Sequence, residues 1–241
     1  MPRRRVWPAT LTALAVLAVG CLGGPDASRT PTGSPPPPET DQNAGDGQDG
    51  DAPDTDEAGL DARAASLRLR VTGPSLLGPV TGSGFAIGPR TVITNAHVVD
   101  GGTEVDLVSW DGDATTSTDI EVAVRNDLGR LTTSDEVPAE PLELADRPAR
   151  RGDEVTVVGF PHGGQITVEE GVEVVDLVDG ASFDEQGEIL VLDTRTVRQG
   201  SSGGPVLDER GRVVGVVFAV EIATQHALAV PVASLQELLD E

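Results

Sequence analysis

Short runs of β-branched residues separated by turn residues are the feature that most constrains the fold of this chain. From residue 67 onward, segments such as RTVITNAHVV, DEVTVVGF and GRVVGVVFAV recur at intervals of roughly 8–12 residues and alternate apolar with polar positions. Such spacing is typical of an antiparallel sandwich or barrel. Only residues 232–241 have helical periodicity, with Ser234 at the expected N-cap. The sequence therefore predicts an all-β domain that ends in a short helix.

The first 65 residues lack this pattern and divide into two parts. Residues 1–21 begin with arginines and continue with an apolar stretch and small residues, which is the layout of a secretory signal peptide. The apolar stretch is too short to cross a membrane comfortably. Residues 22–65 are rich in Pro, Gly, Asp and Thr and nearly empty of large apolar side chains, so we expect a disordered linker. The folded domain is predicted to span residues 66–241.

Cys21 is the only cysteine of the chain, which excludes an intramolecular disulfide. It ends the sequence AVGC, which resembles the lipobox of bacterial lipoproteins. The resemblance implies cleavage before Cys21 and attachment of a lipid to its sulfur, and hence an exported protein anchored to the outer face of the cell membrane. The alternative is an incidental cysteine at the end of an ordinary signal peptide, which would give a secreted protein.

The charge of the chain excludes one class of partner. The formal net charge is −23, and all 17 basic residues are arginines. Binding to nucleic acid needs a basic face that neutralises phosphates, and nothing in the sequence supplies one. We therefore expect no nucleic-acid partner.

The segment RQGSSGGPVL contains the pattern G-x-S-x-G, with Ser202 as its central serine. This pattern also marks the nucleophile elbow of α/β-hydrolases, which needs a strand before the serine and a helix after it. Here Pro205 follows almost directly and the next segments read as strands, so the elbow is excluded. In a loop between strands, the glycines would let the N–H groups of Gly200 and Ser202 converge on an oxyanion. Ser202 is therefore the candidate nucleophile, while Ser201 should point away from that centre.

A serine nucleophile needs a base, and the base needs an acid that orients it. Among the three histidines, His97 lies where a strongly apolar strand meets a Gly-rich turn, whereas His162 is expected at an exposed loop tip. Among the aspartates, Asp127 lies between two apolar runs, as a half-buried carboxylate would. His97 and Asp127 are therefore the candidate base and acid.

The segments TNAHVVDG, NDLGRL and QGSSGGPV, in the order His, Asp, Ser, resemble the trypsin-like serine proteases, and within them the bacterial branch of HtrA/Deg and MarP-like proteases. GSGFAI, GRVVGVVFA and AVPV extend the resemblance over residues 80–233. It implies two six-stranded antiparallel β-barrels with the catalytic residues in the cleft between them. Because the chain ends shortly after AVPV, no PDZ domain is expected.

The resemblance also implies a role for each candidate. His97 would act as general base and then general acid, Asp127 would orient it and stabilise the imidazolium, and Ser202 would form an acyl-enzyme. The backbone N–H groups of Gly200 and Ser202 would form the oxyanion hole. This chemistry requires no metal ion and no cofactor, so neither is expected.

The family's primary substrate pocket corresponds here to positions that include Thr196, Val220 and His226. No carboxylate is evident at its floor, so a preference for Arg or Lys is not expected. His226 could favour an acidic or polar substrate residue, or it could be an ordinary surface histidine.

Together these features predict an extracytoplasmic, membrane-tethered serine endopeptidase that acts on protein or peptide substrates. The alternative is a latent or non-turnover peptide-binding domain on a protease fold, acting as a sensor or chaperone. The complete set of His97, Asp127 and Ser202 favours the enzyme, since a pure binder has no need of all three. An esterase on the same fold is a third, weaker reading.

Overall fold

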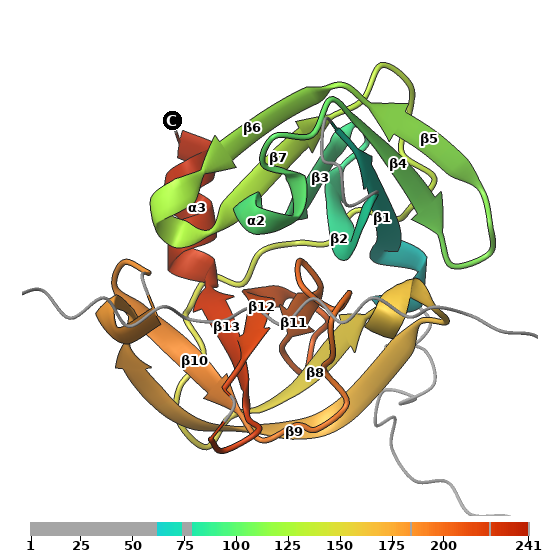
Figure 1. The fold of residues 1–241 in the computed structure, drawn as a ribbon. Helices are drawn as coiled ribbons and strands as arrows, with labels where there is room; N and C mark the ends of the chain where they lie inside the picture. The colour runs from blue at the N-terminus through green and yellow to red at the C-terminus, as the bar shows by residue number, and fades with distance from the viewer. Residues whose placement is uncertain (1–61, 74–78, 184, 222, 241) are drawn as a thin grey trace, which may run out of the picture. The chain divides into compact units, whose positions relative to one another are not determined.

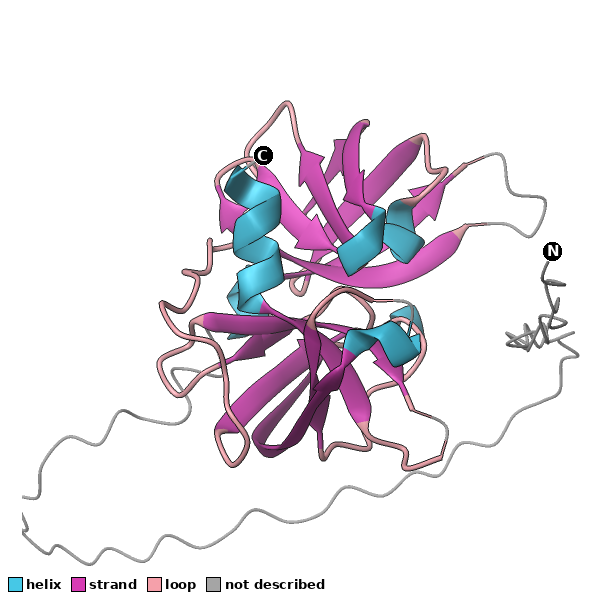
Figure 2. Cartoon of the chain, turned by 90° about the vertical axis from the view of Figure 1, so that its left-hand side faces the viewer, coloured by secondary structure: helices cyan, strands magenta, loops and turns pink. Residues whose placement is uncertain are grey.

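The structure is a computed structural model that describes residues 62–73, 79–183, 185–221 and 223–240. The predicted signal peptide, Cys21 and the linker up to residue 61 lie outside the described residues. The described part contains two antiparallel β-sheets and a C-terminal helix (Figures 1 and 2). The predicted all-β fold with a short terminal helix is therefore confirmed.

The first sheet holds the N-terminal strands in the order β5-β4-β1-β2-β3-β7-β6. They are β1 (Ser66–Thr72), β2 (Val80–Gly88), β3 (Thr91–Thr94), β4 (Glu104–Ser109), β5 (Ala114–Ser117), β6 (Asp119–Ala123) and β7 (Leu128–Thr132). The prediction of a six-stranded closed barrel holds only in part here, because this half is a seven-stranded sheet that strand pairing does not close. The strand pairing is interrupted at Thr118, which divides one stretch into β5 and β6. These two strands are the edges of the sheet, and Ser117 Oγ donates a hydrogen bond of 2.6 Å to the carbonyl of Thr132. The chain itself thus joins the two edges.

The second sheet is a closed six-stranded barrel, as predicted, in the order β10-β13-β12-β11-β8-β9. Its strands are β8 (Glu154–Gly159), β9 (Thr167–Asp179), β10 (Glu188–Leu192), β11 (Pro205–Leu207), β12 (Val213–Val220) and β13 (Ala227–Pro231). Strands β9 and β10 pair along residues 174–179 and 188–192, which closes the ring and leaves no edge strand in this barrel.

The two sheets follow the patterns seen in the sequence. In β1, Leu67, Leu69 and Val71 are buried, whereas the alternate residues Arg68 and Arg70 face outward. Burying one such aliphatic side chain stabilises the fold by roughly 1.5–3 kcal/mol. Strand β12 departs from the predicted alternation, because it is apolar almost throughout and buried over most of its length, as a strand packed on both faces must be.

The folded domain begins earlier than predicted. Residues 62–65 form a helical turn in which Ala62 and Ala65 are buried. Ser66 Oγ donates a hydrogen bond of 2.7 Å to the carbonyl of Ala62, and the N–H of Glu140 donates one of 3.0 Å to the carbonyl of Ala64. Packing against the domain therefore includes Ala62, four residues before the predicted start at residue 66. Alanine carries too little apolar character to mark this turn as part of the core.

The helix α3 (Val232–Asp240) packs between the two sheets' apolar side chains. Leu235 and Leu238 are buried in a cluster that contains Phe85 from the first sheet and Val216 from the second. The helix starts at Val232, so the predicted N-cap Ser234 lies inside it. Figure 1 shows α3, in red, leaving β13 and running beside the first sheet.

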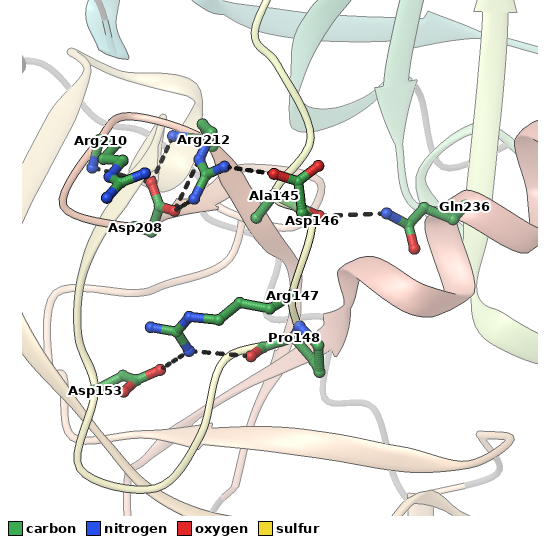
Figure 3. A network of polar contacts seen from close by, with 9 residues as sticks. All are labelled: Ala145, Asp146, Arg147, Pro148, Asp153, Asp208, Arg210, Arg212 and Gln236. Atoms are coloured by element: carbon green, nitrogen blue, oxygen red, sulfur yellow. Dashed lines mark hydrogen bonds and ion pairs between the residues drawn. The ribbon is translucent and has the colours of Figure 1, made fainter.

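Ion pairs tie the segment that connects the two sheets to the second barrel (Figure 3). Arg212 pairs with Asp146 at 3.0 Å and with Asp208 at 2.9 Å, and Arg147 pairs with Asp153 at 2.8 Å. The hydrogen bond from Arg147 holds the pKa of the Asp153 carboxyl below its ordinary value, whereas Asp208 raises the pKa of Arg212. From α3, Gln236 Nε2 donates a hydrogen bond of 3.3 Å to the carbonyl of Ala145 in the same segment.

Candidate active site

His97 lies in α2 (Ala96–Val99), a single helical turn that directly follows β3. The neighbouring Val98 and Val99 are buried among the apolar side chains of the first sheet and anchor this turn there. The His97 ring remains accessible, with 48% of its side chain exposed. The sequence predicted a junction between strand and loop here, and the structure places a helical turn at that junction.

Asp127 faces His97 with both carboxylate oxygens. Its Oδ2 accepts a hydrogen bond of 2.6 Å from His97 Nδ1, and its Oδ1 accepts one of 2.9 Å from the backbone N–H of His97. The Asp127 side chain is 11% exposed. A carboxylate acceptor at Nδ1 puts the proton on that nitrogen and leaves Nε2 free to accept one. The pair therefore has the arrangement that a general base requires.

The backbone of Asp127 is strained. The residue follows η1 (Val124–Asn126) and has a left-handed conformation, with φ 43° and ψ 41°. This conformation costs a non-glycine residue roughly 1–2 kcal/mol. Two hydrogen bonds to the carbonyl of Asp127 hold this backbone in place. One of 2.8 Å comes from Asn95 Nδ2, and one of 3.1 Å comes from the N–H of Ala96.

Asn95 is a residue that the sequence reasoning missed. It is fully buried, and among the residues the structure describes its Oδ1 has no hydrogen-bond partner. Buried amide groups normally have hydrogen-bond partners. The sequence signal for Asn95 is therefore a polar amide that directly follows an apolar strand and precedes His97 by two positions.

Both sheets hold the loop that carries Ser202. In β2, the N–H of Ser83 donates a hydrogen bond of 2.8 Å to the carbonyl of Ser202. The N–H of Gly203 donates one of 2.8 Å to the carbonyl of Val217, which lies in β12. Gly203 has a φ of 89°, and a Cβ there would lie 2.1 Å from the carbonyl oxygen of Ser83. The glycine in this position is therefore required by close contact between the two sheets.

Two backbone N–H groups in this loop are available to an oxyanion. The carbonyl of Gln199 accepts a hydrogen bond of 2.6 Å from the N–H of His162, which lies in η2 (Pro161–Gly163). Because the peptide bond is planar and trans, the N–H of Gly200 must point away from η2. Neither this N–H nor that of Ser202 donates to an acceptor in the part of the chain that the structure describes. Ser201 is buried, and its Oγ accepts 3.3 Å from the N–H of Arg198.

The hydroxyl of Ser202 is not directed to His97 in this structure. Ser202 Oγ donates a hydrogen bond of 3.2 Å to the carbonyl of Phe218, and no hydrogen bond between Ser202 and His97 occurs in the described residues. Rotation about the Cα–Cβ bond of Ser202 is the movement that releases the hydroxyl from Phe218. Catalytic hydrogen bonds are often loose without substrate and tighten only when it binds.

The structure brings together only part of the predicted substrate pocket. Val220 pairs with Ala227 across β12 and β13, which places it beside His226. Thr196 turns its hydroxyl to the carboxylate of Glu169 in β9 instead. A carboxylate also lies near His226, whose Nε2 is 3.7 Å from Asp193 Oδ1. The sequence revealed neither carboxylate as part of this region. Glu169 comes from the distant strand β9, and only the fold brings Asp193 close to His226.

The described residues contain no group of three His, Cys, Asp or Glu side chains that could hold a metal ion. Among them there is also no helix with the length and apolar character needed to cross a membrane.

Comparisons with known proteins identify the family. Residues 82–216, more than half of the chain, match the trypsin-like peptidase domain. The serine protease Rv3671c of Mycobacterium tuberculosis is 34% identical over 161 residues, which are 65% of this chain and 40% of that protein. The chloroplastic Protease Do-like 2 of Arabidopsis thaliana is 38% identical over 149 residues, 58% of this chain and 24% of that protein. The chain thus spans less than half the length of these curated relatives.

A solved structure agrees with these matches. The crystal structure of the active form of the Rv3671c protease from M. tuberculosis has a TM-score of 0.68 and 27% identity, covering 76% of this chain and 82% of that one. The resemblance to the HtrA/Deg and MarP-like branch, predicted from three short motifs, is confirmed. The chain belongs to the trypsin-like peptidase domain family and has its all-β, chymotrypsin-like fold.

Proposed function

We propose that this protein is an extracytoplasmic serine endopeptidase that hydrolyses peptide bonds through an acyl-enzyme on Ser202. The observation that carries the proposal is the double hydrogen bond from His97 to the carboxylate of Asp127. It is supported by the loop of Ser202, which has two N–H groups without an acceptor in the described residues. A binding module needs neither feature, whereas acyl transfer needs both.

The reaction follows from the positions of these groups. His97 Nε2 takes the proton of Ser202 Oγ as this oxygen attacks the carbonyl carbon of the substrate. The negative charge that develops on the carbonyl oxygen is stabilised by the N–H groups of Gly200 and Ser202, each worth about 3–4 kcal/mol of the barrier. The imidazolium, stabilised by Asp127, gives its proton to the leaving amine. Water then repeats the sequence and releases the acid.

The substrates proposed are exposed or unfolded protein segments, since the catalytic histidine is open to solvent and the chain matches named proteases. We place the pocket for the acyl-side residue next to the scissile bond at Val220 and His226, whereas the hydroxyl of Thr196 is bound to the carboxylate of Glu169. Asp193, beside His226, gives that region a carboxylate that attracts a basic or polar side chain of the substrate.

A latent form of the same enzyme is the second candidate. It is favoured by one observation, the hydrogen bond of Ser202 Oγ to the carbonyl of Phe218 in place of His97. In this reading the hydroxyl turns to His97 only when a peptide or partner binds, and until then the domain binds peptides without turnover.

Turnover of reduced, alkylated casein by the purified full chain tests the enzyme against the binding domain. We expect cleavage by the wild type and a loss of at least about a thousandfold in Ser202→Ala. Asp127→Asn should lose activity as well while remaining folded. The endopeptidase proposal is overturned if the wild type binds casein, followed by fluorescence anisotropy, but leaves it uncleaved.

We further propose that Cys21 carries a lipid that anchors the protein outside the cell membrane. The support is the sequence AVGC after an apolar stretch, and a related protein of Bartonella henselae is named as a probable periplasmic serine endoprotease. Phase separation in Triton X-114 of membranes from expressing bacteria tests the anchor. The wild type should enter the detergent phase and Cys21→Ser the aqueous phase. Equal partition of both would contradict lipid attachment.

A further inference from the structure

The first sheet has a cavity next to the loop of Ser202. Its volume is about 440 Å³, and it is lined by Arg68 and Arg70 of β1, Thr81 of β2, Asp106 of β4, Thr116 of β5, and Gly163 at the end of η2. The lining mixes charged and hydroxyl groups with apolar surface, part of it from Val108 of β4 and Ala114 of β5, and it comes mostly from the outward face of four neighbouring strands. The cavity contains none of the residues assigned above to the reaction.

The strand register places both arginines in this cavity. Leu67, Leu69 and Val71 of β1 point into the core, so Arg68 and Arg70 share the opposite face. Arg70 lies directly across from Thr81 on one side and Asp106 on the other. Residues paired in this way project from the same face of a sheet.

The cavity has an excess of positive charge in a chain whose net charge is −23. Two guanidinium groups face the single carboxylate of Asp106. Arg68 Nη1 donates a hydrogen bond of 3.2 Å to the carbonyl of Gly163. The other N–H groups of Arg68 donate to no acceptor among the described residues. Arg70 makes no hydrogen bond or ion pair with any residue that the structure describes. A guanidinium presents a planar fork of donors that fits a carboxylate.

This cavity borders the loop of Ser202 from the first sheet. Arg68 in β1 pairs with Ser83 in β2. The N–H of Ser83 donates a hydrogen bond of 2.8 Å to the carbonyl of Ser202, and its Oγ donates one of 2.7 Å to the carbonyl of Gly200. On its other margin, Gly163 follows His162, which holds the carbonyl of Gln199. The cavity therefore adjoins the proposed oxyanion loop along two of its walls.

The position of the cavity indicates which part of a substrate would reach it. Ser202 Oγ lies against Phe218 of β12, so β12 flanks the serine from the second barrel. The cavity lies on the other side, on β1 and β2 of the first sheet. If the acyl part of a peptide follows β12, its leaving-group part leaves the serine on the side of the first sheet, toward Thr81 and the two arginines.

We propose that this cavity is a subsite for the carboxylate of an aspartate or glutamate on the leaving-group side of the scissile bond. The subsite rests on the proposed endopeptidase function and gives it a substrate class, namely segments with acidic residues after the cleaved bond. Arg70 is the specificity-determining residue, and Arg68 assists it while it holds Gly163.

The first experiment is cleavage of a proteome-derived peptide library by the full chain, with the new termini identified by mass spectrometry. Asp and Glu should be enriched on the leaving-group side of the cleaved bonds. From the best-cleaved sequence, two synthetic peptides are made that differ only by Asp/Glu against Asn/Gln at the enriched positions. We expect the acidic peptide to have an about fivefold higher kcat/KM, which corresponds to roughly 1 kcal/mol for a partly exposed ion pair.

Variants of Arg70 assign this preference. Arg70→Gln should bring the ratio between the two peptides close to one by lowering kcat/KM for the acidic peptide about fivefold. A general loss of structure would lower kcat/KM for both peptides alike and keep their ratio. Arg70→Glu should favour a peptide with Arg at those positions. Arg90→Gln, an exposed arginine in the turn between β2 and β3, is the matched control and should keep the wild-type ratio.

The failure of the subsite and the failure of the endopeptidase give different results. Cleavage that needs Ser202 but treats both peptides equally, or a ratio that survives Arg70→Gln, would overturn the subsite alone. If the wild type cleaves nothing, binding of a fluorescent acidic peptide to Ser202→Ala still tests the cavity. That binding should weaken about fivefold on adding Arg70→Gln, and equal binding would overturn the subsite.

Discussion

At the scale of single residues, backbone positions determine where the proposed catalytic groups lie. Asp127 has a left-handed backbone, and the loop of Ser202 passes Ser83 so closely that no Cβ fits at residue 203. Conformations of this kind persist only where surrounding contacts hold them. Asn95 and Ala96 provide such contacts for Asp127.

Substitution of Gly203 tests the close contact. In Gly203→Ala, the added Cβ would lie 2.1 Å from the Ser83 carbonyl oxygen and 2.4 Å from Thr94 Oγ1, at a φ of 89°. We expect a loss of about 2–5 kcal/mol in the free energy of unfolding and loss of activity. Gly211→Ala, at a φ of 73° with nothing within 4 Å of its Cβ, is the control and should cost about 1 kcal/mol. Urea unfolding of both variants measures the difference, and equal losses would contradict the contact.

Removal of the Asn95 amide tests how Asp127 is held. Asn95→Ala leaves the carbonyl of Asp127 without its 2.8 Å donor, so we expect a loss of about 1–3 kcal/mol of stability. Because the backbone of Asp127 positions His97, kcat should fall about tenfold or more, with KM nearly unchanged. Steady-state kinetics on casein-derived peptides measure both constants. An unchanged kcat in a destabilised variant would show that Asn95 has a structural role only.

At the scale of elements, α3 and the connecting segment fix the second barrel to the rest of the described domain. Leu235 of α3 is fully buried in a cluster that includes Phe85 and Val216. Leu235→Ala should therefore cost about 2–5 kcal/mol in the free energy of unfolding, whereas the exposed Glu237→Ala should cost less than about 0.5 kcal/mol. Urea unfolding measures both. A small effect of Leu235→Ala would mean that α3 is not needed by the cluster.

The ion pair of Arg147 with Asp153 gives stability that depends on pH. The hydrogen bond from Arg147 lowers the pKa of the Asp153 carboxyl in the folded state. Its stabilisation is therefore present above the ordinary aspartate pKa, about 3.9, and is lost as the pH falls through the lowered folded value. Asp153→Asn should lower the Tm at pH 7, and the difference from the wild type should shrink below about pH 4.

Calorimetry across this pH range checks the prediction. Glu170→Gln changes an exposed carboxyl in β9 that has no ion pair among the described residues, and it is the matched control. Its Tm should follow that of the wild type at every pH. A difference between Asp153→Asn and the wild type that stays constant down to acid pH would contradict the assigned ion pair.

At the scale of the whole molecule, the sequence predicted most of the fold. Alternating apolar runs indicated the strands, and the closed second barrel and the terminal helix agree with them. Two features were out of reach. The interruption between β5 and β6 at Thr118 depends on pairing between distant strands. Residues 62–65 join the core through alanines that are too small for composition to reveal their burial.

The candidate site was predictable to a different degree for each group. His97, Asp127 and Ser202 stand in motifs with a fixed order, so their identity as candidates came from sequence. The hydrogen bond of Ser202 to Phe218 and the support of Asp127 by Asn95 did not, because they join segments that only the fold brings together. The cavity at Arg68 and Arg70 was invisible for the same reason, since alternation shows which face a residue occupies and not what lies beside it.

Intact mass of the purified full chain after treatment with a fluorophosphonate tests most directly whether Ser202 is an activated nucleophile. We expect a single adduct at one equivalent in the wild type, because the reagent needs a serine assisted by His97 and an oxyanion site at Gly200 and Ser202. Ser202→Ala should show none, and Ser201→Ala should react like the wild type if it is folded. A folded wild type that gains no adduct, or an adduct that persists in Ser202→Ala, would contradict the assignment of Ser202 as the nucleophile.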